Sequence, residues 1–363
     1  MRLNKIYIKS FRNLEQTELS LGKRFNIFYG NNAQGKTNLL ECIYLLATMK
    51  SFRMARNSEL IAWNSEYSLI KGWVEKDNVS REISLLLEKL GKKAKLDQKI
   101  VTRLADFFGN LNVVVFTPEE ITMVRGVPEL RRRYLDRAVF TSNLGYLALF
   151  HDYTKILKNR NMLLKNNETT GLDIWTEKLI EFGSRIIEKR TAYLDEMKVI
   201  LRSYYRDISG TDEIVDIGYK TNYMDGNTSF SIGETMLTAL ANRATEERRR
   251  GTTLVGPHRD DIEFLLNDKP LKHFGSQGQQ RSYILALKMA EIEYIQRKFG
   301  SPPILLLDDM TSELDRERNQ NLMDFLKKRE MQVFITTTNL QNIMLEGIEN
   351  KRTFLVKEGR VHH

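Results

Sequence analysis

The sequence predicts an α/β protein with a mixed or parallel sheet that carries a phosphate-binding loop. A mainly helical lobe is inserted into the chain. Three observations support this prediction. Residues Gly30 to Thr37 read G-x-x-x-x-G-K-T between an apolar run and a helical pattern. From about 120 to 250 the pattern is almost entirely helical. Short, fully apolar strands return in the last quarter of the chain, as buried parallel strands do.

The glycine-rich loop predicts a nucleotide site. The apolar run Phe25 to Tyr29 reads as a buried strand, and the residues after Thr37 have apolar side chains at helical spacing. Strand, loop and helix together turn backbone N–H groups and a helix N-terminus toward phosphate oxygens. We expect Lys36 to reach the β- and γ-phosphates of ATP and Thr37 to ligate Mg²⁺. The predicted nucleotide-binding residues here are Gly30, Asn31, Asn32, Ala33, Gln34, Gly35, Lys36, Thr37 and Asn38.

Composition places limits on the class of protein. The chain has 363 residues, of which 41% are hydrophobic and 28% charged, as in a soluble globular protein of one large domain or two. A net charge of +9 favours a polyanionic partner such as nucleic acid. The single cysteine, Cys42, excludes a disulfide framework and suits a reducing cytoplasm. We expect no membrane partner, because no run of 18 apolar residues is present.

A second part of the nucleotide site is predicted far along the chain. The run Ile304 to Leu307 reads as a buried strand and ends in Asp308 and Asp309. A carboxylate at the end of such a strand holds Mg²⁺ in phosphate-loop enzymes, and Asp308 fits that role. Asp309 follows directly and is the candidate general base for the attacking water. Lys36, Asp308 and Asp309 are therefore the predicted catalytic residues.

The distance between these two parts indicates an insertion. Lys36 and Asp308 are 272 positions apart (308 − 36), more than a compact phosphate-loop domain needs. We therefore predict an ATPase lobe I made of residues 1–119 and 251–363, and an inserted helical lobe II made of 120–250.

A second anion-binding helix start is predicted at Ser276. Ser276 is a good N-cap, Gly278 allows close backbone approach, and a helical pattern follows. One nucleotide needs one phosphate loop, so this second start suggests contact with the nucleotide of another subunit; an ordinary capped helix is the alternative. Ser276, Gln277, Gly278 and Gln279 are the predicted nucleotide-binding residues of this segment.

Basic residues gather in the helical lobe. Leu130, Tyr134, Leu135 and Ala138 form an apolar stripe, which leaves neighbouring arginines toward solvent or a partner. No base-reading motif is visible, so we predict sequence-independent contact with the phosphates of double-stranded DNA; a solvated helix face is the alternative. The predicted DNA contacts are Arg131, Arg132, Arg133 and Arg137.

The order of these motifs resembles that of the ABC-type ATPases, and within them the SMC-like DNA-repair heads. Ser276 to Gln280 looks like their signature motif, Ser312 to Asp315 like the D-loop, and Thr336 to Thr338 lies at the switch position. Four stretches narrow the resemblance to the RecF family of bacterial recombination mediators. They are Ser10 to Asn13; Gly126 to Pro128 with Arg131 to Asp136; Val255 to Asp261; and Leu307 to Asp309 with Ser312 to Asp315.

This resemblance implies an ABC-type ATPase head that dimerises head to head when ATP binds. Ser276, Gly278, Ser312 and Asp315 would lie at that homodimer interface, and Arg12 would flank the nucleotide base or be a plain surface residue. The dimer would bind duplex DNA until hydrolysis dissolves it. The resemblance also implies work with RecR and RecO in loading RecA at gaps in damaged DNA.

Two departures from the family pattern affect the expected chemistry. The switch region has Thr338 where ABC transporters often have His, and the candidate base is Asp309 rather than Glu. A shorter side chain holds the water poorly, so we expect slow turnover, below the general enzyme median of about 10 s⁻¹. The joint between lobes reads Phe116-Thr117-Pro118-Glu119 and has no glutamine of the Q-loop type.

Besides a RecF-like DNA-binding ATPase, two other classes of protein remain open from sequence. A transport-type ABC ATPase fits less well, because the chain is basic and lacks a clear Q-loop. A nucleotide kinase would share the phosphate loop but has no use for Ser276 to Gln280 or for Asp309. The stretch Gly256 to Asp261 is either a tight turn or, as the resemblance implies, part of the lobe junction near nucleotide or the dimer interface.

Overall fold

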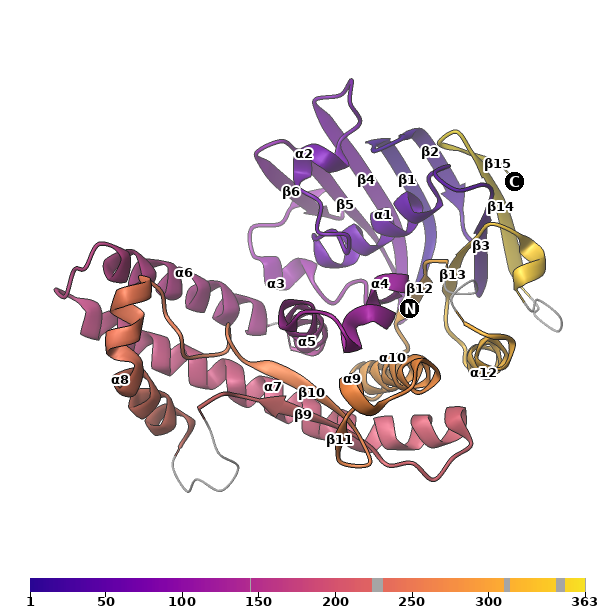
Figure 1. Ribbon diagram of the computed structural model, residues 1–363. Helices are drawn as coiled ribbons and strands as arrows, with labels where there is room; N and C mark the ends of the chain where they lie inside the picture. Colours follow the sequence, from indigo (N-terminus) through magenta and orange to yellow (C-terminus); the bar gives the residue numbers. More distant parts are fainter. Residues whose placement is uncertain (144, 224–230, 310–313, 344–349, 363) are drawn as a thin grey trace. The chain divides into compact units, whose positions relative to one another are not determined.

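The computed structural model describes residues 1–143, 145–223, 231–309, 314–343 and 350–362 (Figure 1). The chain divides into two compact units, Met1–Ile121 with Ile284–His363, and Thr122–Tyr283. The first boundary falls close to the predicted one at 119. The second falls at Tyr283 rather than at 250, and it lies inside helix α10 (Gln277–Phe299).

The first unit contains an antiparallel sheet in the order β2-β1-β4-β5-β6-β7. Its main hairpin, β4–β5, turns at Asp77 and Asn78, both with positive φ. Buried and exposed residues alternate along β1, so one face is packed and the other is open. The strands are β1 (Arg2–Phe11), β2 (Leu14–Ser20), β4 (Tyr67–Lys76), β5 (Val79–Glu88), β6 (Gly91–Leu96) and β7 (Lys99–Ile100).

The second sheet of this unit has the order β15-β14-β3-β13-β12-β8 and is parallel except at the edge strand β15. Strands β12 and β13 are buried over their whole length and β3 over all but Tyr29, which explains why they read as largely apolar runs. The sheet brings the end of β3 and the end of β12 to the same edge. The strands are β3 (Phe25–Tyr29), β8 (Val113–Phe116), β12 (Ile304–Leu307), β13 (Val333–Thr337), β14 (Lys351–Lys357) and β15 (Arg360–His362).

Helix α1 (Lys36–Thr48) packs against strands of both sheets. Ten residues in a row, Leu39 to Thr48, are buried, because the helix is covered on all sides. Cys42 lies in this core with no exposed surface, as a small apolar side chain does. The other helices of this unit are α2 (Asn57–Leu60), α3 (Leu104–Phe107), α4 (Pro118–Ile121), α12 (Arg316–Lys327) and the 3₁₀ turn η2 (Leu340–Asn342).

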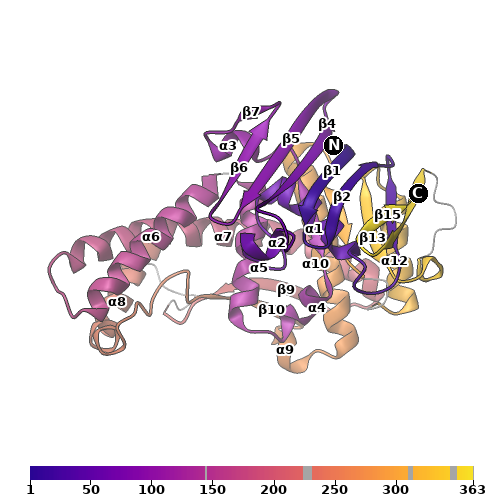
Figure 2. The same cartoon turned by 90° about the horizontal axis from the view of Figure 1, so that it is seen from above.

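The second unit is mainly helical and is built on the 38-residue helix α7. Helix α6 packs along α7, and α8 packs against both, as Figures 1 and 2 show. The apolar side chains of α7 recur at three- and four-residue intervals, which gives it one buried face. The helices are η1 (Thr122–Val124), α5 (Pro128–Ser142), α6 (Gly145–Lys165), α7 (Leu172–Ser209), α8 (Ile232–Arg250) and α9 (Leu271–Phe274).

A small antiparallel sheet explains why the second boundary differs from the predicted one. It has the order β11-β10-β9, made of β9 (Val215–Lys220), β10 (Asp261–Leu266) and β11 (Lys269–Pro270). Asp261 pairs with Lys220 and Leu266 with Val215. Residues 251–283 therefore belong with the helical unit, and the pairing of β10 with β9 across the intervening α8 was not visible in the local pattern.

Candidate nucleotide-binding site

The phosphate-binding loop runs from the end of β3 into α1, as predicted. Gly30 and Gly35 have φ values of 145° and 112°, which glycine adopts without strain. A Cβ at Gly30 would lie 2.3 Å from the carbonyl oxygen of Val356, and one at Gly35 would lie 2.8 Å from Oδ1 of Asn13. Both glycines are thus required by backbone shape and by close neighbours.

Lys36 folds back over the loop. Its Nζ donates hydrogen bonds to the carbonyl oxygens of Gly30 (2.6 Å) and Asn31 (2.8 Å). Burial lowers the pKa of Lys36, while the nearby carboxylates of Asp308 and Asp309 act in the opposite direction. The ammonium group therefore sits at the loop, close to two acidic side chains.

Thr37 and Asp308 meet directly, although they are far apart in sequence. The Thr37 hydroxyl donates a 2.8 Å hydrogen bond to Oδ1 of Asp308, and Thr336 donates another, also 2.8 Å, to the same oxygen. Burial raises the pKa of Asp308, and these two hydrogen bonds partly offset that effect. The structure thus brings together the two residues that the sequence assigned to Mg²⁺.

Asp309 lies beside this pair and lines a cavity at the phosphate loop. Its backbone N–H donates to the Thr336 hydroxyl at 2.9 Å, so Thr336 contacts both acidic residues. The cavity has a volume of about 260 Å³. Its lining residues are Asn32, Ala33, Gly35, Lys36, Thr37, Asn38, Arg53, Asp309 and Thr336.

Asn13 holds the outside of the loop. Its Nδ2 donates to the Gln34 carbonyl (3.1 Å), and its Oδ1 accepts from Asn38 (2.7 Å). The turn between β14 and β15 adds two backbone donors: Gly359 N–H to the Gln34 carbonyl at 3.0 Å, and Glu358 N–H to Gln34 Oε1 at 2.6 Å. The first turn and the last hairpin of the chain therefore fix one residue of the phosphate loop.

Arg12 is neither an unpaired surface residue nor a free neighbour of the loop. Its guanidinium forms two hydrogen bonds to Glu41, at 2.6 and 3.1 Å, and Glu41 is fully buried in α1. Ser51 also donates to Glu41. Arg12 thus ties the β1–β2 turn to α1, and the surface alternative for this residue is not supported.

The signature segment lies in the helical unit, at the start of α10. Ser276 and Gln279 cap each other: Gln279 N–H donates to the Ser276 hydroxyl (3.2 Å) and Ser276 N–H to Gln279 Oε1 (2.7 Å). Gln279 also donates to Glu213 (2.6 Å), so its side chain is committed to the helix start. Ser276 and Gln277 are exposed, and Gly278 is partly exposed.

The predicted D-loop residues are Ser312 and Asp315. Ser312 lies outside the described residues. Asp315 is the N-cap of α12, where its carboxylate accepts from Arg318 N–H at 2.9 Å and pairs with the Arg318 side chain. This is the ordinary role of aspartate at a helix start.

The four arginines predicted to contact DNA are largely engaged within the helical unit. Arg131 is buried and forms a two-pronged ion pair with Asp261 (2.8 Å for both bonds) and further bonds to backbone carbonyls. Arg132 donates to the Asp260 carbonyl (2.8 Å), and Arg133 pairs with Glu129. Arg137 lies 5.9 Å from the centre of the Tyr134 ring. The assignment of Arg131 to DNA is wrong, because its donors are used inside the fold.

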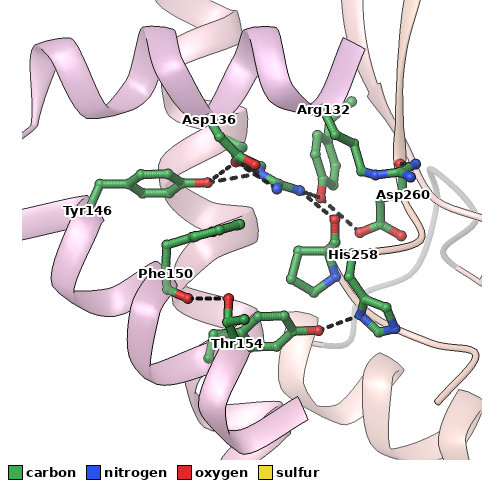
Figure 3. Close-up of polar contacts among 11 residues, drawn as sticks. Arg132, Asp136, Tyr146, Phe150, Thr154, His258 and Asp260 are labelled. Atoms are coloured by element: carbon green, nitrogen blue, oxygen red, sulfur yellow. Dashed lines mark hydrogen bonds and ion pairs between the residues drawn. The ribbon is translucent and has the colours of Figure 1, made fainter. Parts of the chain in front are cut away.

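The stretch Gly256 to Asp261 forms a tight turn, closed by a 2.8 Å bond from Arg259 N–H to the Gly256 carbonyl. A buried network holds it (Figure 3). Arg190 pairs with Asp136 (2.7 Å) and donates to the Pro257 carbonyl (2.7 Å), and Tyr153 contacts His258 (2.7 Å). Burial lowers the pKa of His258 to about 4, so this imidazole is neutral at pH 7.

Asp260 in this turn is a buried acid, and among the described residues no basic side chain bonds to its carboxylate. Its Oδ2 accepts from Tyr219 (2.8 Å) and Tyr223 (3.2 Å), while Oδ1 has no partner among the described residues. Burial raises the pKa of Asp260 to about 7. Of the two readings of this stretch, the turn is what the structure shows.

Sequence reasoning missed three residues of the site. Asn13 was seen only as part of a motif, Arg53 was not considered, and Thr336 was placed at the switch without a role. Asn13 had a usable signal, because asparagine is favoured in tight turns and it lies in the short connection between β1 and β2. Arg53 and Thr336 join the site only through the fold.

Comparison with known proteins identifies the family. The model of the RecF/RecN/SMC N terminal domain matches residues 2–362. The DNA replication and repair protein RecF of Geotalea uraniireducens (strain Rf4) is 67% identical over 364 residues, covering 100% of both chains. The protein of the same name from Bacillus cytotoxicus is 41% identical over 368 residues, covering 99% of this chain and 98% of that one.

Solved structures of RecF and of an Smc head are similar to this chain. One of the recombination mediator protein RecF with ATP, in the RecFOR pathway, is 33% identical with a TM-score of 0.89, covering 99% of this chain and 96% of that one. The Smc head domain of Pyrococcus furiosus shares the fold, at 14% identity and a TM-score of 0.55. In the part of the chain that the structure describes, no helix combines the length and hydropathy needed to cross a bilayer. The fold is that of an ABC-type ATPase head with a helical lobe, and the chain belongs to the RecF branch of the RecF/RecN/SMC family.

Proposed function

We propose that this protein is an ATP-gated, DNA-binding protein of recombinational repair in the bacterial cytoplasm. ATP binding would drive head-to-head dimerisation and the retention of duplex DNA, and slow hydrolysis would release it. The observation that supports this best is the convergence of Lys36, Thr37 and Asp309 around one cavity at the phosphate loop, with Asp308 hydrogen-bonded to Thr37. Relatives named DNA replication and repair proteins, and RecF structures solved with ATP, point the same way.

The residues present fit Mg²⁺-ATP. Thr37 and Asp308 present two oxygens 2.8 Å apart, and a hydroxyl and a carboxylate are the hard donors that Mg²⁺ takes alongside phosphate oxygens and water. When bound, the cation would neutralise the charge that develops on the phosphates. The loop backbone between Gly30 and Thr37 and the Lys36 ammonium would bind the phosphates themselves.

Hydrolysis would depend on how Asp309 is held. Its side chain reaches the cavity from a backbone fixed by Thr336, and it would accept the proton of the attacking water. Lys36 would stabilise charge on the transferred phosphate. We expect turnover slower than about 10 s⁻¹, the median for enzymes, because aspartate is shorter than the usual glutamate.

The signature segment supports a composite site. Ser276 is exposed at the start of a 23-residue helix that begins in the second unit, so its side chain can face a partner. We propose that Ser276, Gln277 and Gly278 bind the nucleotide held by a second copy, with Asp315 and Ser312 at the same interface. Gln279 would act by shaping the helix start, since its side chain bonds Ser276 and Glu213.

Partners follow from the family. The dimer would hold double-stranded DNA without regard to sequence, and would act with RecR and RecO to help load RecA. The net charge of +9 agrees with a polyanionic partner.

The test is retention of duplex DNA under different nucleotides. A fluorescent duplex of random sequence is titrated with protein plus Mg²⁺ and ATP, ADP or no nucleotide. Tight binding with ATP, weak binding with ADP, and a steep salt dependence are expected. Equal binding under all three conditions would refute gating by ATP.

A further inference from the structure

Six exposed basic residues of the helical unit lie together at α6, at the end of α8 and in the turn that follows. Three are on α6 at positions i, i+3 and i+10, so they share one face of the helix. The six residues are Lys155, Lys158, Lys165, Arg248, Arg249 and Arg259, and all are exposed. We call them the α6–α8 basic surface.

The two helix ends are joined by specific contacts. Gly251, which ends α8, lies against the end of α6: a Cβ on it would be 3.3 Å from Lys165 Cα. Asn161 Oδ1 accepts from the Thr253 backbone N–H (2.8 Å). Arg259 donates to the Thr253 carbonyl (3.2 Å), which brings it to the same place. Figures 1 and 2 both show α6 and α8 side by side.

The α6–α8 basic surface forms no ion pairs in the part of the chain that the structure describes. By contrast, Arg160 and Arg250 of the same helices pair with Glu247 and Glu246. The nearest acids along the chain are engaged elsewhere: Asp152 lies 3.8 Å from His151, and Glu168 accepts from Asn166. The two paired arginines, buried Arg160 and exposed Arg250, therefore differ from the six members of the surface, which face solvent without an ion pair among the described residues.

The spacing suits a phosphate backbone. From Lys155 to Lys165 the helix rises about 15 Å, which is the length of roughly four base pairs of B-DNA. The arginines at the end of α8 lie next to the end of α6, where Gly251 meets Lys165. By contrast, Arg131 of α5 donates to Asp261 and Arg132 donates to the Asp260 carbonyl, both within the helical unit.

We infer that the α6–α8 basic surface, rather than α5, binds the phosphate backbone of duplex DNA. This inference rests on the proposed function and names the surface through which it acts. The exposed lysines would contribute point charges, and Arg248, Arg249 and Arg259 would add donors suited to phosphate oxygens. No base contact is required, so binding would depend on salt and hardly on sequence.

The test removes the three lysines of α6 together. The variant Lys155→Gln/Lys158→Gln/Lys165→Gln changes only exposed side chains, so its thermal unfolding should match the parent. With ATP at about 0.1 M salt, its affinity for duplex DNA should fall at least roughly tenfold. The slope of log affinity against log salt should become shallower by about 2 to 3, close to 0.9 for each lost phosphate contact.

A matched control removes the same charge elsewhere. Lys178, Lys298 and Lys328 are also exposed and form no ion pair among the described residues. Their triple replacement by glutamine should leave the salt slope as in the parent. If the α6 variant binds duplex DNA with the parental affinity and salt slope, the inference fails. If the parent itself binds no duplex with ATP, the proposed function fails and the inference falls with it.

Discussion

The hydroxyl of Thr336 donates a 2.8 Å hydrogen bond to Oδ1 of Asp308, which also accepts from Thr37. The same Thr336 hydroxyl accepts the backbone N–H of Asp309 at 2.9 Å. A single fully buried hydroxyl on β13 therefore positions both acidic residues at the end of β12. Its importance for hydrolysis can be measured.

Thr336→Val keeps the shape of the side chain but removes the hydroxyl. Asp308 loses a donor and the Asp309 N–H loses its acceptor, which we expect to lower kcat by roughly tenfold or more while ATP affinity changes less. Thr336→Ser should restore most of the rate. Steady-state kinetics of both variants provide the check, and a valine variant with the parental kcat would show that Thr336 does not position the acids.

Asn13→Ala removes the contact between the first turn and the phosphate loop. Two hydrogen bonds, to the Gln34 carbonyl and from Asn38, are lost, so the loop should be less well ordered before ATP arrives. At about 1 kcal/mol each, we expect a five- to thirtyfold weaker affinity for ATP with a smaller change in kcat. Calorimetric titration of ATP measures this. Asn64→Ala, at an exposed turn, is the control, and equal affinities of the two variants would contradict the role of Asn13.

Asp309→Asn should trap the ATP-bound state. The amide cannot accept the proton of the attacking water, while the phosphate loop and Asp308 are left intact. We expect ATP binding close to that of the parent, hydrolysis reduced by at least about a hundredfold, and a long-lived dimer. The lifetime is followed after excess ADP is added. A dimer that dissolves as fast as the parental one would count against Asp309 as the base.

Asp260→Asn should change how stability depends on pH. Burial raises the pKa of Asp260 from 3.8 to about 7. Between these values the folded protein holds a proton that the unfolded chain has released, so this group's contribution to the free energy of unfolding falls as pH rises, by up to about 1.4 kcal/mol per pH unit. Buried His258 has the opposite effect below pH 6.5, because its pKa is lowered to about 4.

The difference between parent and Asp260→Asn isolates the carboxyl group. Urea unfolding from pH 4 to 8 should show a difference in unfolding free energy that shrinks or changes sign as pH rises and levels off above about 7. A difference that stays constant over this range would mean that Asp260 is already ionised throughout.

The parts of the fold that the sequence predicted are those set by local pattern. The strand from Phe25, the loop to Thr37 and the following helix carry their own signals in spacing, glycine and apolar runs. The strand that ends at Asp308 is equally plain, because a parallel strand buried on both faces is apolar throughout. Their meeting at one sheet edge follows from the rule that parallel strands share a carboxyl end.

The rest depends on contacts between distant segments. Nothing local in 251–283 shows that Asp261 pairs with Lys220, so the boundary at 250 was misplaced. Arg131 resembles any surface arginine in its helical pattern, and only the fold brings Asp261 to it at 2.8 Å. Arg53 and Thr336 reach the cavity from segments with no phosphate-binding motif.

The central claim is that ATP is held between two copies, with Ser276 of one copy at the nucleotide of the other. The most direct measurement is the mass in solution of the parent and of Ser276→Arg, by sedimentation or light scattering, with Mg²⁺ and either ATP or ADP. The account predicts that the 42.4 kDa parent becomes a dimer with ATP and stays a monomer with ADP. It predicts that Ser276→Arg binds ATP yet remains a monomer in both. A Ser276→Arg protein that dimerises with ATP and hydrolyses it at the parental rate would contradict the account.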